Sequence, residues 1–293
     1  MREVLYEALA VAGRQLSLDT VDRLGCGFGD LLWRLLPKRR AIAEKAMIHH
    51  LGIAESEARK MCRVNFQHTG RGFMEILAAR KADWRFFEKR VELEHREYFE
   101  ELMRTDRPRV IVTCHLGSWE LTNGLLNLLF SDTPRVILGR RLKDSALNEV
   151  LIRLRTHRGV GYIMHRKAVF PVLRTLRRNG IFAPLVDHNC LAEEALFLPF
   201  MNDLAAVNRG PALLAVRAGA VLFPAAMVRL GNGRYKLMMG EPLDSKTLPG
   251  TMEERTDAVT RYYNDSVLKL ITRYPEQWFW MHRRWKTRPP EGS

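Results

Sequence analysis

Short β-branched apolar segments alternate with segments of helical length from about residue 106 onward. This alternation is typical of an α/β fold, in which helices cover a sheet. The predicted strands are Arg109–Cys114, Arg135–Leu138, Ile181–Val186, Val221–Val228 and Tyr235–Met239. The predicted helices are Trp119–Phe130, Ser145–His157, Ala168–Arg178, Gly210–Ala218 and Met252–Arg273. We therefore expect residues 106–293 to form an α/β core.

Residues 1–105 are predicted to be helical, without a strong strand pattern. One predicted helix carries an apolar stripe and ends near a basic cluster; the stripe consists of Val21, Leu24, Phe28, Leu31, Leu32 and Leu35. Such a stripe usually faces a protein core. Next to Lys38-Arg39-Arg40, it also suits a helix that lies on a membrane. Both interpretations stay open. No linker separates this region from the core, so we expect one continuous structural unit.

The segment His115-Leu116-Gly117-Ser118-Trp119-Glu120 joins the first predicted strand of the core to the following helix. Active sites of open α/β sheets collect at such strand ends. A histidine there is suited to remove a proton from a hydroxyl, and a carboxylate is suited to fix its tautomer. His115 and Glu120 can meet only if His115 lies in a turn, which Gly117 permits.

The same segment also fits an ordinary helix start. Ser118 would then cap the helix, and Glu120 would interact with the positive end of the helix dipole. His115 would be an incidental loop residue. The residues of this segment do not by themselves decide between a catalytic pair and a helix cap.

The chain of 293 residues carries a net charge of +14, which predicts an anionic partner. Nucleic acid, an acidic carrier protein, a phosphorylated substrate and a membrane surface all qualify. The cations are scattered over several elements, and no nucleic-acid-binding signature is present. We therefore expect no nucleic-acid partner.

The sequence contains no pattern typical of a metal site, a disulfide framework or a membrane span. Cys26, Cys62, Cys114 and Cys190 lack paired spacing, and reduced thiols in a cytoplasmic setting are expected. The longest stretches without a charged residue have eleven residues, such as 121–131, whereas a span needs about 20 apolar residues. We expect no metal, no cofactor, no secretory signal and no transmembrane helix.

Several motifs resemble those of the lipid A biosynthesis (lauroyl/myristoyl) acyltransferase family of Gram-negative bacteria, within the glycerolipid acyltransferase superfamily. His115 and Glu120 are similar to the His-x4-Asp/Glu motif of that superfamily. The other matching segments are Arg23–Gly29, Pro37–Arg40, Gly139–Asp144, Leu185–His188, Phe197–Phe200 and Pro275–Pro289. The resemblance extends from about residue 18 to residue 290.

The resemblance implies a central mixed β-sheet flanked by helices, as in glycerolipid acyltransferases, with an N-terminal helical, membrane-associating region. It implies acyl transfer from an acyl carrier protein thioester to a hydroxyl of a phosphorylated lipid A precursor. The site would lie at the cytoplasmic face of the bacterial inner membrane, with peripheral attachment. Carried over, His115 would be the general base and Glu120 its orienting partner. Backbone N–H groups near Gly117 and Ser118, or a nearby arginine, would stabilise the oxyanion.

Six further residues near predicted strand ends are candidate substrate contacts: Arg140, Arg166, Lys167, Asp187, His188 and Arg209. Arginine matches phosphate oxygens well, and a phosphate-binding role is favoured for Arg140 and Arg209. Most single arginines are merely solvated. Asp187 and His188 end a predicted strand, where they would support the site or position a substrate. Alternatively, Asp187 would cap a turn.

The segment His282-Arg283-Arg284-Trp285-Lys286 mixes aromatic and cationic side chains. It suits contacts with lipid phosphates at a membrane interface. It suits equally well a structural role, in which cation–π packing covers the sheet edge.

Three other functions compete with lipid A acylation. The first is the same chemistry on another glycolipid or a phospholipid, with acyl coenzyme A as the donor. The second is a basic nucleic-acid-binding protein. The third is a membrane-associated scaffold without catalytic activity, which would not need His115.

Overall fold

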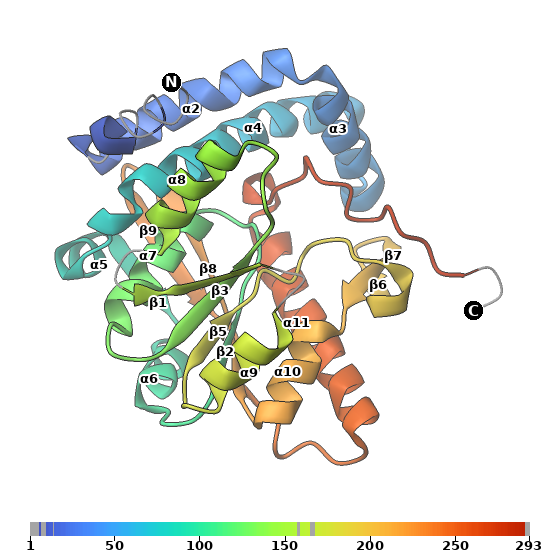
Figure 1. Ribbon diagram of the computed structural model, residues 1–293. Helices are drawn as coiled ribbons and strands as arrows, with labels where there is room; N and C mark the ends of the chain where they lie inside the picture. Colours follow the sequence, from blue (N-terminus) through green and yellow to red (C-terminus); the bar gives the residue numbers. More distant parts are fainter. Residues whose placement is uncertain (1–5, 7–9, 14, 157–158, 165–167, 291–293) are drawn as a thin grey trace.

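The computed structural model describes residues 6, 10–13, 15–156, 159–164 and 168–290, and Figure 1 shows their arrangement. The elements follow in this order: α2 (Leu18–Leu35), α3 (Pro37–Leu51), α4 (Glu55–Ala78), 3-10 helix η1 (Ala79–Lys81), α5 (Trp84–Arg90), β1 (Val91–Glu94), α6 (Arg96–Arg104), β2 (Arg109–Val112), α7 (Trp119–Leu129), β3 (Arg135–Gly139), α8 (Ser145–Arg155), β4 (Gly161–Met164), α9 (Val169–Leu176), β5 (Ile181–Ala183), 3-10 helix η4 (Ala192–Glu194), β6 (Ala195–Phe200), β7 (Asp203–Asn208), α10 (Gly210–Ala218), β8 (Val221–Gly231), β9 (Arg234–Met239), β10 (Leu243–Asp244), α11 (Met252–Arg273) and 3-10 helix η5 (Pro275–Gln277).

A mixed sheet lies at the centre of the described chain. Seven strands follow the order β1-β9-β8-β2-β5-β3-β4, and β10 pairs with β8. β2 lies parallel to both β5 and β8, whereas β9 and β10 run antiparallel to β8. The predicted mixed sheet flanked by helices is confirmed. Because β2 lies between two parallel neighbours, the residues that follow it lie near the middle of the sheet edge.

Alternate side chains of β2 enter two cores on opposite faces of the sheet. Val110 and Val112 pack in the core to which α9, α10 and α11 contribute. Ile111 packs in the core that includes residues of α5, α6 and α7. Successive side chains of a strand point to opposite faces, and both faces of β2 are covered. This explains the continuous apolar run that made the strand visible in the sequence.

Strands β1, β4, β6, β7 and β10 were not among the predicted strands. Residues 91–94 form β1, which pairs with β9, so the prediction of a purely helical region up to residue 105 is wrong there. This strand is short and carries two glutamates, so it lacks the apolar pattern of a buried strand. Strands β6 and β7 form a separate antiparallel hairpin that was not predicted.

The apolar stripe of α2 mostly faces outward. Leu24, Phe28 and Leu31 are exposed, while only Val21 of the stripe is completely buried. Instead, α2 packs on α4 through glycines: a Cβ atom on Gly29 would lie 2.3 Å from the carbonyl oxygen of Phe66. The interpretation that the stripe fills a core is therefore wrong for most of its residues. None of the described helices combines the length and apolar character needed to cross a bilayer.

The aromatic and cationic segment near the C-terminus is partly structural. Arg284 is fully buried and donates to the carbonyl oxygens of Ala206 (2.6 Å) and His188 (3.3 Å). Its guanidinium lies over the ring of Phe200, while Trp285 stacks on His50. These contacts support the structural interpretation for Arg284 and Trp285.

Candidate active site

His115 lies just after β2, in a tight turn that precedes α7. Gly117 adopts a left-handed backbone conformation with φ of 59°. A Cβ atom at this position would lie 2.2 Å from the carbonyl oxygen of Met227, so only glycine fits. The turn is fixed further because the Phe279 N–H donates to the His115 carbonyl oxygen at 2.9 Å. His115 is thus held at the carboxyl end of the strand, as predicted.

Asp187 holds the imidazole of His115. The Nδ1 atom lies 2.8 Å from Oδ1 of Asp187, and the backbone N–H of His115 donates to Oδ2 at 2.9 Å. Trp278 donates its indole N–H to the same Oδ2, also at 2.9 Å. Asp187 is fully buried. Its carboxylate therefore fixes the orientation of the ring with Nδ1 protonated, which leaves a lone pair on Nε2.

The sheet topology explains why His115 and Asp187 meet. Asp187 follows β5, and β5 pairs in parallel with β2. An isolated bridge between Thr113 and Leu185 continues this pairing beyond the two strands. The residues that follow the bridge therefore lie side by side at the sheet edge.

The expectation that Glu120 orients His115 is at variance with the geometry. Glu120 is buried, and its carboxylate accepts from Arg155 Nε at 3.1 and 3.2 Å and from Arg155 Nη2. No hydrogen bond in the described chain joins Glu120 to His115. Glu120 lies in the first turn of α7, and its side chain joins α7 to α8. The turn at Gly117 lies between His115 and Glu120 in the chain. The carboxylate that contacts His115 is that of Asp187, which follows β5.

The backbone N–H groups of Gly117 and Ser118 are not free to stabilise an oxyanion. The Gly117 N–H donates to the carbonyl oxygen of Gln277 at 3.1 Å, and that of Ser118 to Met227 at 2.7 Å. The Ser118 hydroxyl donates to buried Glu75 at 3.0 Å. The expectation of oxyanion donors at these two positions is therefore wrong. Both N–H groups already form hydrogen bonds that hold the turn against β8 and η5.

Two further histidines lie beside His115. The His188 ring centroid is 4.3 Å from that of His115, and His282 lies 5.7 Å from His188. His188 keeps an exposed edge, yet the atoms packed around its ring and the charge on His115 lower its pKa to about 4. Burial lowers the pKa of His282 to about 3. Both rings are therefore neutral near pH 7 and add no positive charge beside His115.

Asp187 is the negative charge of this cluster. Burial alone would raise the pKa of its carboxyl group, but the charge on protonated His115 and the hydrogen bond to it have the larger opposite effect. The pKa of Asp187 therefore lies below its ordinary value, and the group is ionised at neutral pH. A buried carboxylate next to an imidazole stabilises the imidazolium that forms when the ring takes a proton.

Aromatic rings lie next to the imidazole of His115. The side chain of His115 is 17% exposed. Its ring centroid lies 5.7 Å from Trp119 and 6.0 Å from Phe279, and Phe73 contacts both of these rings. The sequence did not identify Trp278, Phe279 or Phe73 as site residues, although the density of aromatic residues near the C-terminus was visible. These rings place an apolar surface next to the imidazole.

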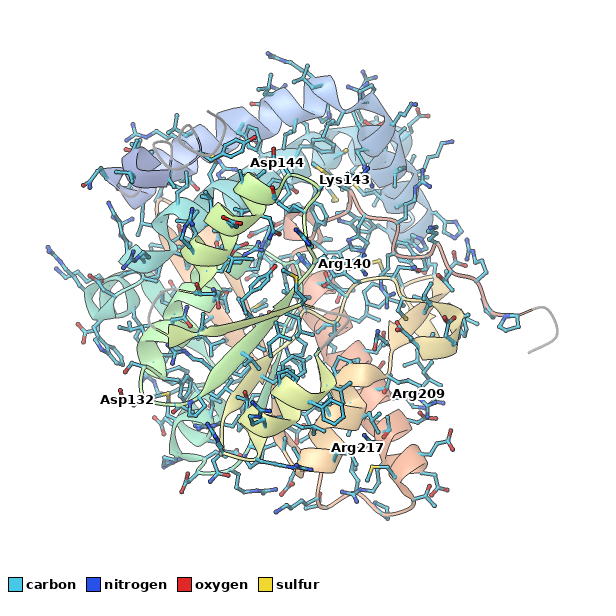
Figure 2. The ribbon with its side chains drawn as sticks, viewed as in Figure 1. Asp132, Arg140, Lys143, Asp144, Arg209 and Arg217 are labelled. Atoms are coloured by element: carbon cyan, nitrogen blue, oxygen red, sulfur yellow. The ribbon has the colours of Figure 1, made fainter. Side chains whose placement is uncertain are left out.

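The candidate substrate contacts fall into different places, as Figure 2 shows for Arg140 and Arg209. Arg140 is exposed after β3, and its positive charge contributes to the lowered pKa of His188. Arg209 pairs with Asp257 at 2.6 Å and with Glu253 at 3.3 Å of α11, so it is engaged within the protein. Asp187 is buried with both oxygens occupied, which is at variance with direct substrate contact. Arg166 and Lys167 lie outside the described residues.

A group able to hold a metal ion occurs away from His115. Ligand atoms of His49, His50 and Asp203 lie within 4.8 Å of one another, and His49 Nε2 is 3.3 Å from Asp203 Oδ2. It is the one such group among the described residues.

The pair of His115 and Asp187 is suited to proton transfer. Nε2 of the partly exposed His115 ring can accept a proton while the buried Asp187 carboxylate stabilises the charge.

Comparison with known proteins gives the family. The model for bacterial lipid A biosynthesis acyltransferases matches residues 2–287. The chain is 28% identical to a lipid A biosynthesis lauroyltransferase of Escherichia coli K12, over 94% of this chain and 88% of the relative. It is 26% identical to the lipid A biosynthesis palmitoleoyltransferase of the same strain, over the same shares of the two chains.

A solved 1-acyl-sn-glycerophosphate acyltransferase of Thermotoga maritima aligns with 84% of this chain and 97% of its own length. The sequence identity is 15% and the TM-score is 0.37, so this weak likeness carries no further argument. The family model, in contrast, spans almost the whole sequence and includes the strand end with His115. The chain belongs to the bacterial lipid A biosynthesis acyltransferase family.

Proposed function

We propose that this protein transfers a fatty acyl chain from an acyl carrier protein thioester to a hydroxyl group of a lipid A precursor, with His115 as the general base. The observation that carries the proposal is the contact between His115 Nδ1 and Asp187 Oδ1, at 2.8 Å, beside a partly exposed ring. The pair lies in a chain of the matching family. We assign the orienting role to Asp187 in place of Glu120.

The chemistry proceeds in two stages on one imidazole. Nε2 of His115 takes the proton of the acceptor hydroxyl as its oxygen attacks the thioester carbonyl carbon. Asp187 stabilises the imidazolium that forms. The tetrahedral intermediate then collapses, the carbon–sulfur bond breaks, and the imidazolium proton passes to the departing thiolate. The products are an ester and a free thiol, and no external energy source is needed because the thioester is already activated.

The outward stripe of α2 supports attachment to a membrane surface, where the acceptor lipid resides. Leu24, Phe28, Leu31 and Leu35 are exposed on one helix, and Lys38 follows at the start of α3. Apolar side chains next to cations bind the boundary between headgroups and acyl chains. We propose peripheral attachment at the cytoplasmic face of the inner membrane through this stripe, within the N-terminal segment up to residue 105.

Arg140 is the proposed contact for an acceptor phosphate. It is exposed, follows β3 at the same sheet edge as His115, and is close enough to lower the pKa of His188. Among the candidate cations, Arg209 is engaged by two carboxylates of α11. A guanidinium near the nucleophile would orient a phosphorylated sugar lipid by paired hydrogen bonds.

The decisive experiment is an assay of the purified protein with a lipid A precursor and a series of acyl carrier protein thioesters. Mass spectrometry of the product reports the acyl length and the position acylated. The expected product is a precursor with one additional ester-linked chain, absent with His115→Ala. Parallel reactions with acyl coenzyme A and with phospholipid acceptors test the alternatives. Transfer to a phospholipid but not to the lipid A precursor would overturn the assigned acceptor.

A further inference from the structure

Four arginines line a hollow formed by α9, the turn after it, α10 and the start of α11. The hollow has a volume of about 660 Å³, and its lining includes Arg174, Arg177, Arg178, Arg217, Phe170 and Met252. We call this surface the arginine groove. No carboxylate belongs to its lining. It is separate from the site around His115, and the transfer mechanism leaves it without a role.

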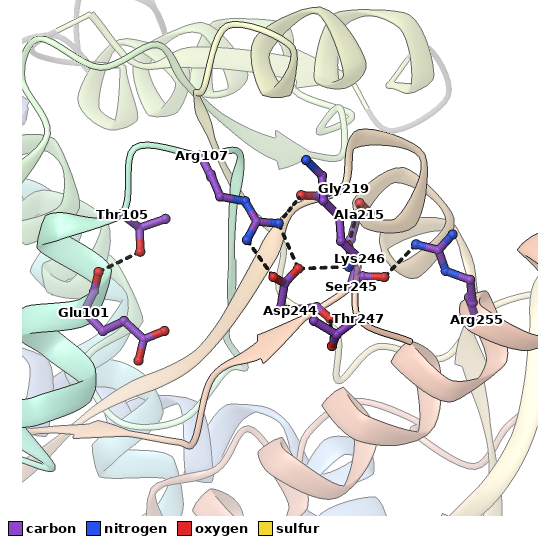
Figure 3. A network of polar contacts seen from close by, with 10 residues as sticks. All are labelled: Glu101, Thr105, Arg107, Ala215, Gly219, Asp244, Ser245, Lys246, Thr247 and Arg255. Atoms are coloured by element: carbon purple, nitrogen blue, oxygen red, sulfur yellow. Dashed lines mark hydrogen bonds and ion pairs between the residues drawn. The ribbon is translucent and has the colours of Figure 1, made fainter. Parts of the chain in front are cut away.

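The arginines of the groove are available to a partner. All four are exposed, and none forms an ion pair with a carboxylate in the described part of the chain. Other arginines near the end of α10 are engaged, as Figure 3 shows. Arg107 donates to both carboxylate oxygens of Asp244 at 2.6 and 2.8 Å, and Arg255 donates to the Ser245 carbonyl oxygen at 2.7 Å. Arg107 also donates to the carbonyl oxygen of Gly219, directly after α10, at 3.0 Å. These contacts hold the end of α10 and the start of α11 in place beneath the groove.

Exposed apolar side chains accompany the cations. Phe170 is 81% exposed at the start of α9, and Met252 is 45% exposed at the start of α11. Aromatic residues, methionine and arginine are the residues enriched in protein–protein interfaces. Solvation of the four arginines alone does not explain an exposed phenylalanine among them. The groove therefore combines apolar anchors with a positive rim, which fits an acidic protein surface.

The position of the groove suits a donor that arrives from water. Figure 1 shows α9 and α10 at the opposite end of the molecule from α2, which carries the proposed membrane contact. The helix α9 follows β4, a strand parallel to β3, so its first residues lie on the sheet edge where the strands end. Its eight residues span about 12 Å. Phe170, at the start of α9, therefore lies nearer the edge that holds His115 than the arginines at the end of the helix.

We propose that the arginine groove is the docking surface for the acidic acyl carrier protein that delivers the thioester. The carrier lies against α9 and α10, with its carboxylates on Arg174, Arg177, Arg178 and Arg217 and an apolar side chain on Phe170. Its prosthetic arm extends past the start of α9 to His115. This inference rests on the proposed function, because that function supplies the carrier protein as a partner.

The test reverses charge in the groove with a matched control. Arg174→Glu with Arg178→Glu changes two exposed cations four positions apart. The control, Arg85→Glu with Lys89→Glu, makes the same charge change at the same spacing on α5. Fluorescence anisotropy measures the Kd for a labelled holo acyl carrier protein without turnover. We expect the groove variant to raise Kd at least ~10-fold and the control to change it less than ~2-fold. Salt should weaken wild-type binding and have less effect on the groove variant.

Activity provides the second readout. With the carrier-bound thioester, the groove variant should show a KM raised by a similar factor at nearly unchanged kcat. With an acyl pantetheine thioester that lacks the carrier, its rate should match that of the wild type. Urea unfolding midpoints equal to the wild type exclude a folding defect. Equal losses with both donors, or unchanged carrier affinity, would overturn the docking proposal.

The groove and the proposed function can fail separately. If no thioester supports transfer to the lipid acceptor, the proposed function fails, whereas the anisotropy measurement still decides whether the groove binds the carrier. If the wild type does not bind the carrier, the groove proposal is wrong. If the double variant loses affinity for anionic vesicles while carrier affinity is unchanged, the groove is a lipid contact and the proposal is also wrong.

Discussion

Asp187 and Glu120 are both buried near the turn after β2, and they make different contacts. Asp187 accepts from the His115 backbone N–H, the His115 ring and the Trp278 indole. Glu120 accepts only from Arg155 in the described structure, across the interface of α7 and α8. One carboxylate is joined to a group that can exchange protons, and the other to a permanently charged guanidinium. Spacing along the chain is therefore a weak guide to which carboxylate forms a hydrogen bond with a histidine.

The largest expected effect comes from His115→Ala. Removal of the base should lower kcat about 10³-fold or more, because the lowered pKa values of His188 and His282 make both rings weak bases. Stability should change little, since His115 is held in a turn mainly through its backbone. Initial rates with a carrier thioester and a urea unfolding curve measure both quantities. Wild-type turnover by this variant would show that His115 is not the general base, and Asp187 would then have no catalytic partner.

Asp187→Asn tests the first carboxylate directly. The amide keeps the shape of the side chain. Its NH2 group, however, would face one of the N–H donors from which Asp187 accepts a hydrogen bond in the wild type. We expect kcat to fall on the order of 10²-fold, because the tautomer of His115 is no longer fixed and its imidazolium is less stabilised. The pH profile of kcat should shift as well. A variant that keeps both the rate and the pH profile would show that Asp187 is only structural.

Glu120→Gln tests whether the second carboxylate serves stability and not catalysis. Loss of its charge leaves Arg155 without its carboxylate partner, and we expect destabilisation of about 1–3 kcal/mol. At temperatures where the variant is folded, kcat should fall less than ~10-fold. Thermal unfolding and steady-state rates provide the two numbers. A loss of kcat larger than that of Asp187→Asn, in a folded protein, would reverse the roles given to the two carboxylates.

Arg140→Ala removes a cation that belongs to neither the His115–Asp187 pair nor the Arg155–Glu120 pair. Because Arg140 is exposed at the same edge as His115, its loss should raise the KM for the phosphorylated acceptor by roughly 10-fold and change kcat little. Steady-state rates at varied acceptor concentration measure this. The matched change Arg141→Ala, at the exposed neighbouring position, serves as the control. An unchanged KM would return Arg140 to ordinary surface charge.

The pH dependence of stability tests the burial of His282, apart from catalysis. Burial lowers the pKa of His282 to about 3, while the unfolded chain binds a proton on this residue near pH 6.5. Between these values the unfolded state holds more protons, so the free energy of unfolding should fall as the pH falls below 6.5. Urea unfolding at pH 7 and pH 5 should show a loss of about 2 kcal/mol from this residue, because each pH unit below 6.5 costs about 1.4 kcal/mol. In His282→Gln the same pH change should have a smaller effect, and an equal one would exclude His282 as its source.

Much of the fold was predictable because periodicity reports burial. The helices at Gly210–Ala218 and Met252–Arg273 were predicted with the bounds that the structure has. The central strands were found because both of their faces are covered, which demands uninterrupted apolar side chains. Strand β1, with the sequence Val-Glu-Leu-Glu, escaped because a half-buried edge strand needs only two apolar residues. The β6–β7 hairpin lies outside the main sheet, and the alternation of strands and helices gave no signal for it.

The candidate site was predictable in location but not in its contacts. His115 was expected at a strand end because the apolar run before it is short and β-branched. Asp187 was expected near the site for the same reason, yet its pairing with His115 depends on β5 lying next to β2. The sequence order of the strands does not contain that neighbour relation.

The sequence by itself determined the α/β class, the position of His115 at a strand end, and the excess of positive charge. Each of these follows from residue type and local spacing, which act within a few positions of the chain. Only the tertiary structure decided that Asp187 holds the imidazole, that Glu120 pairs with Arg155, and that the stripe of α2 faces outward. These outcomes depend on contacts between distant segments, because the packing of strands and helices determines which side chains meet and which remain exposed.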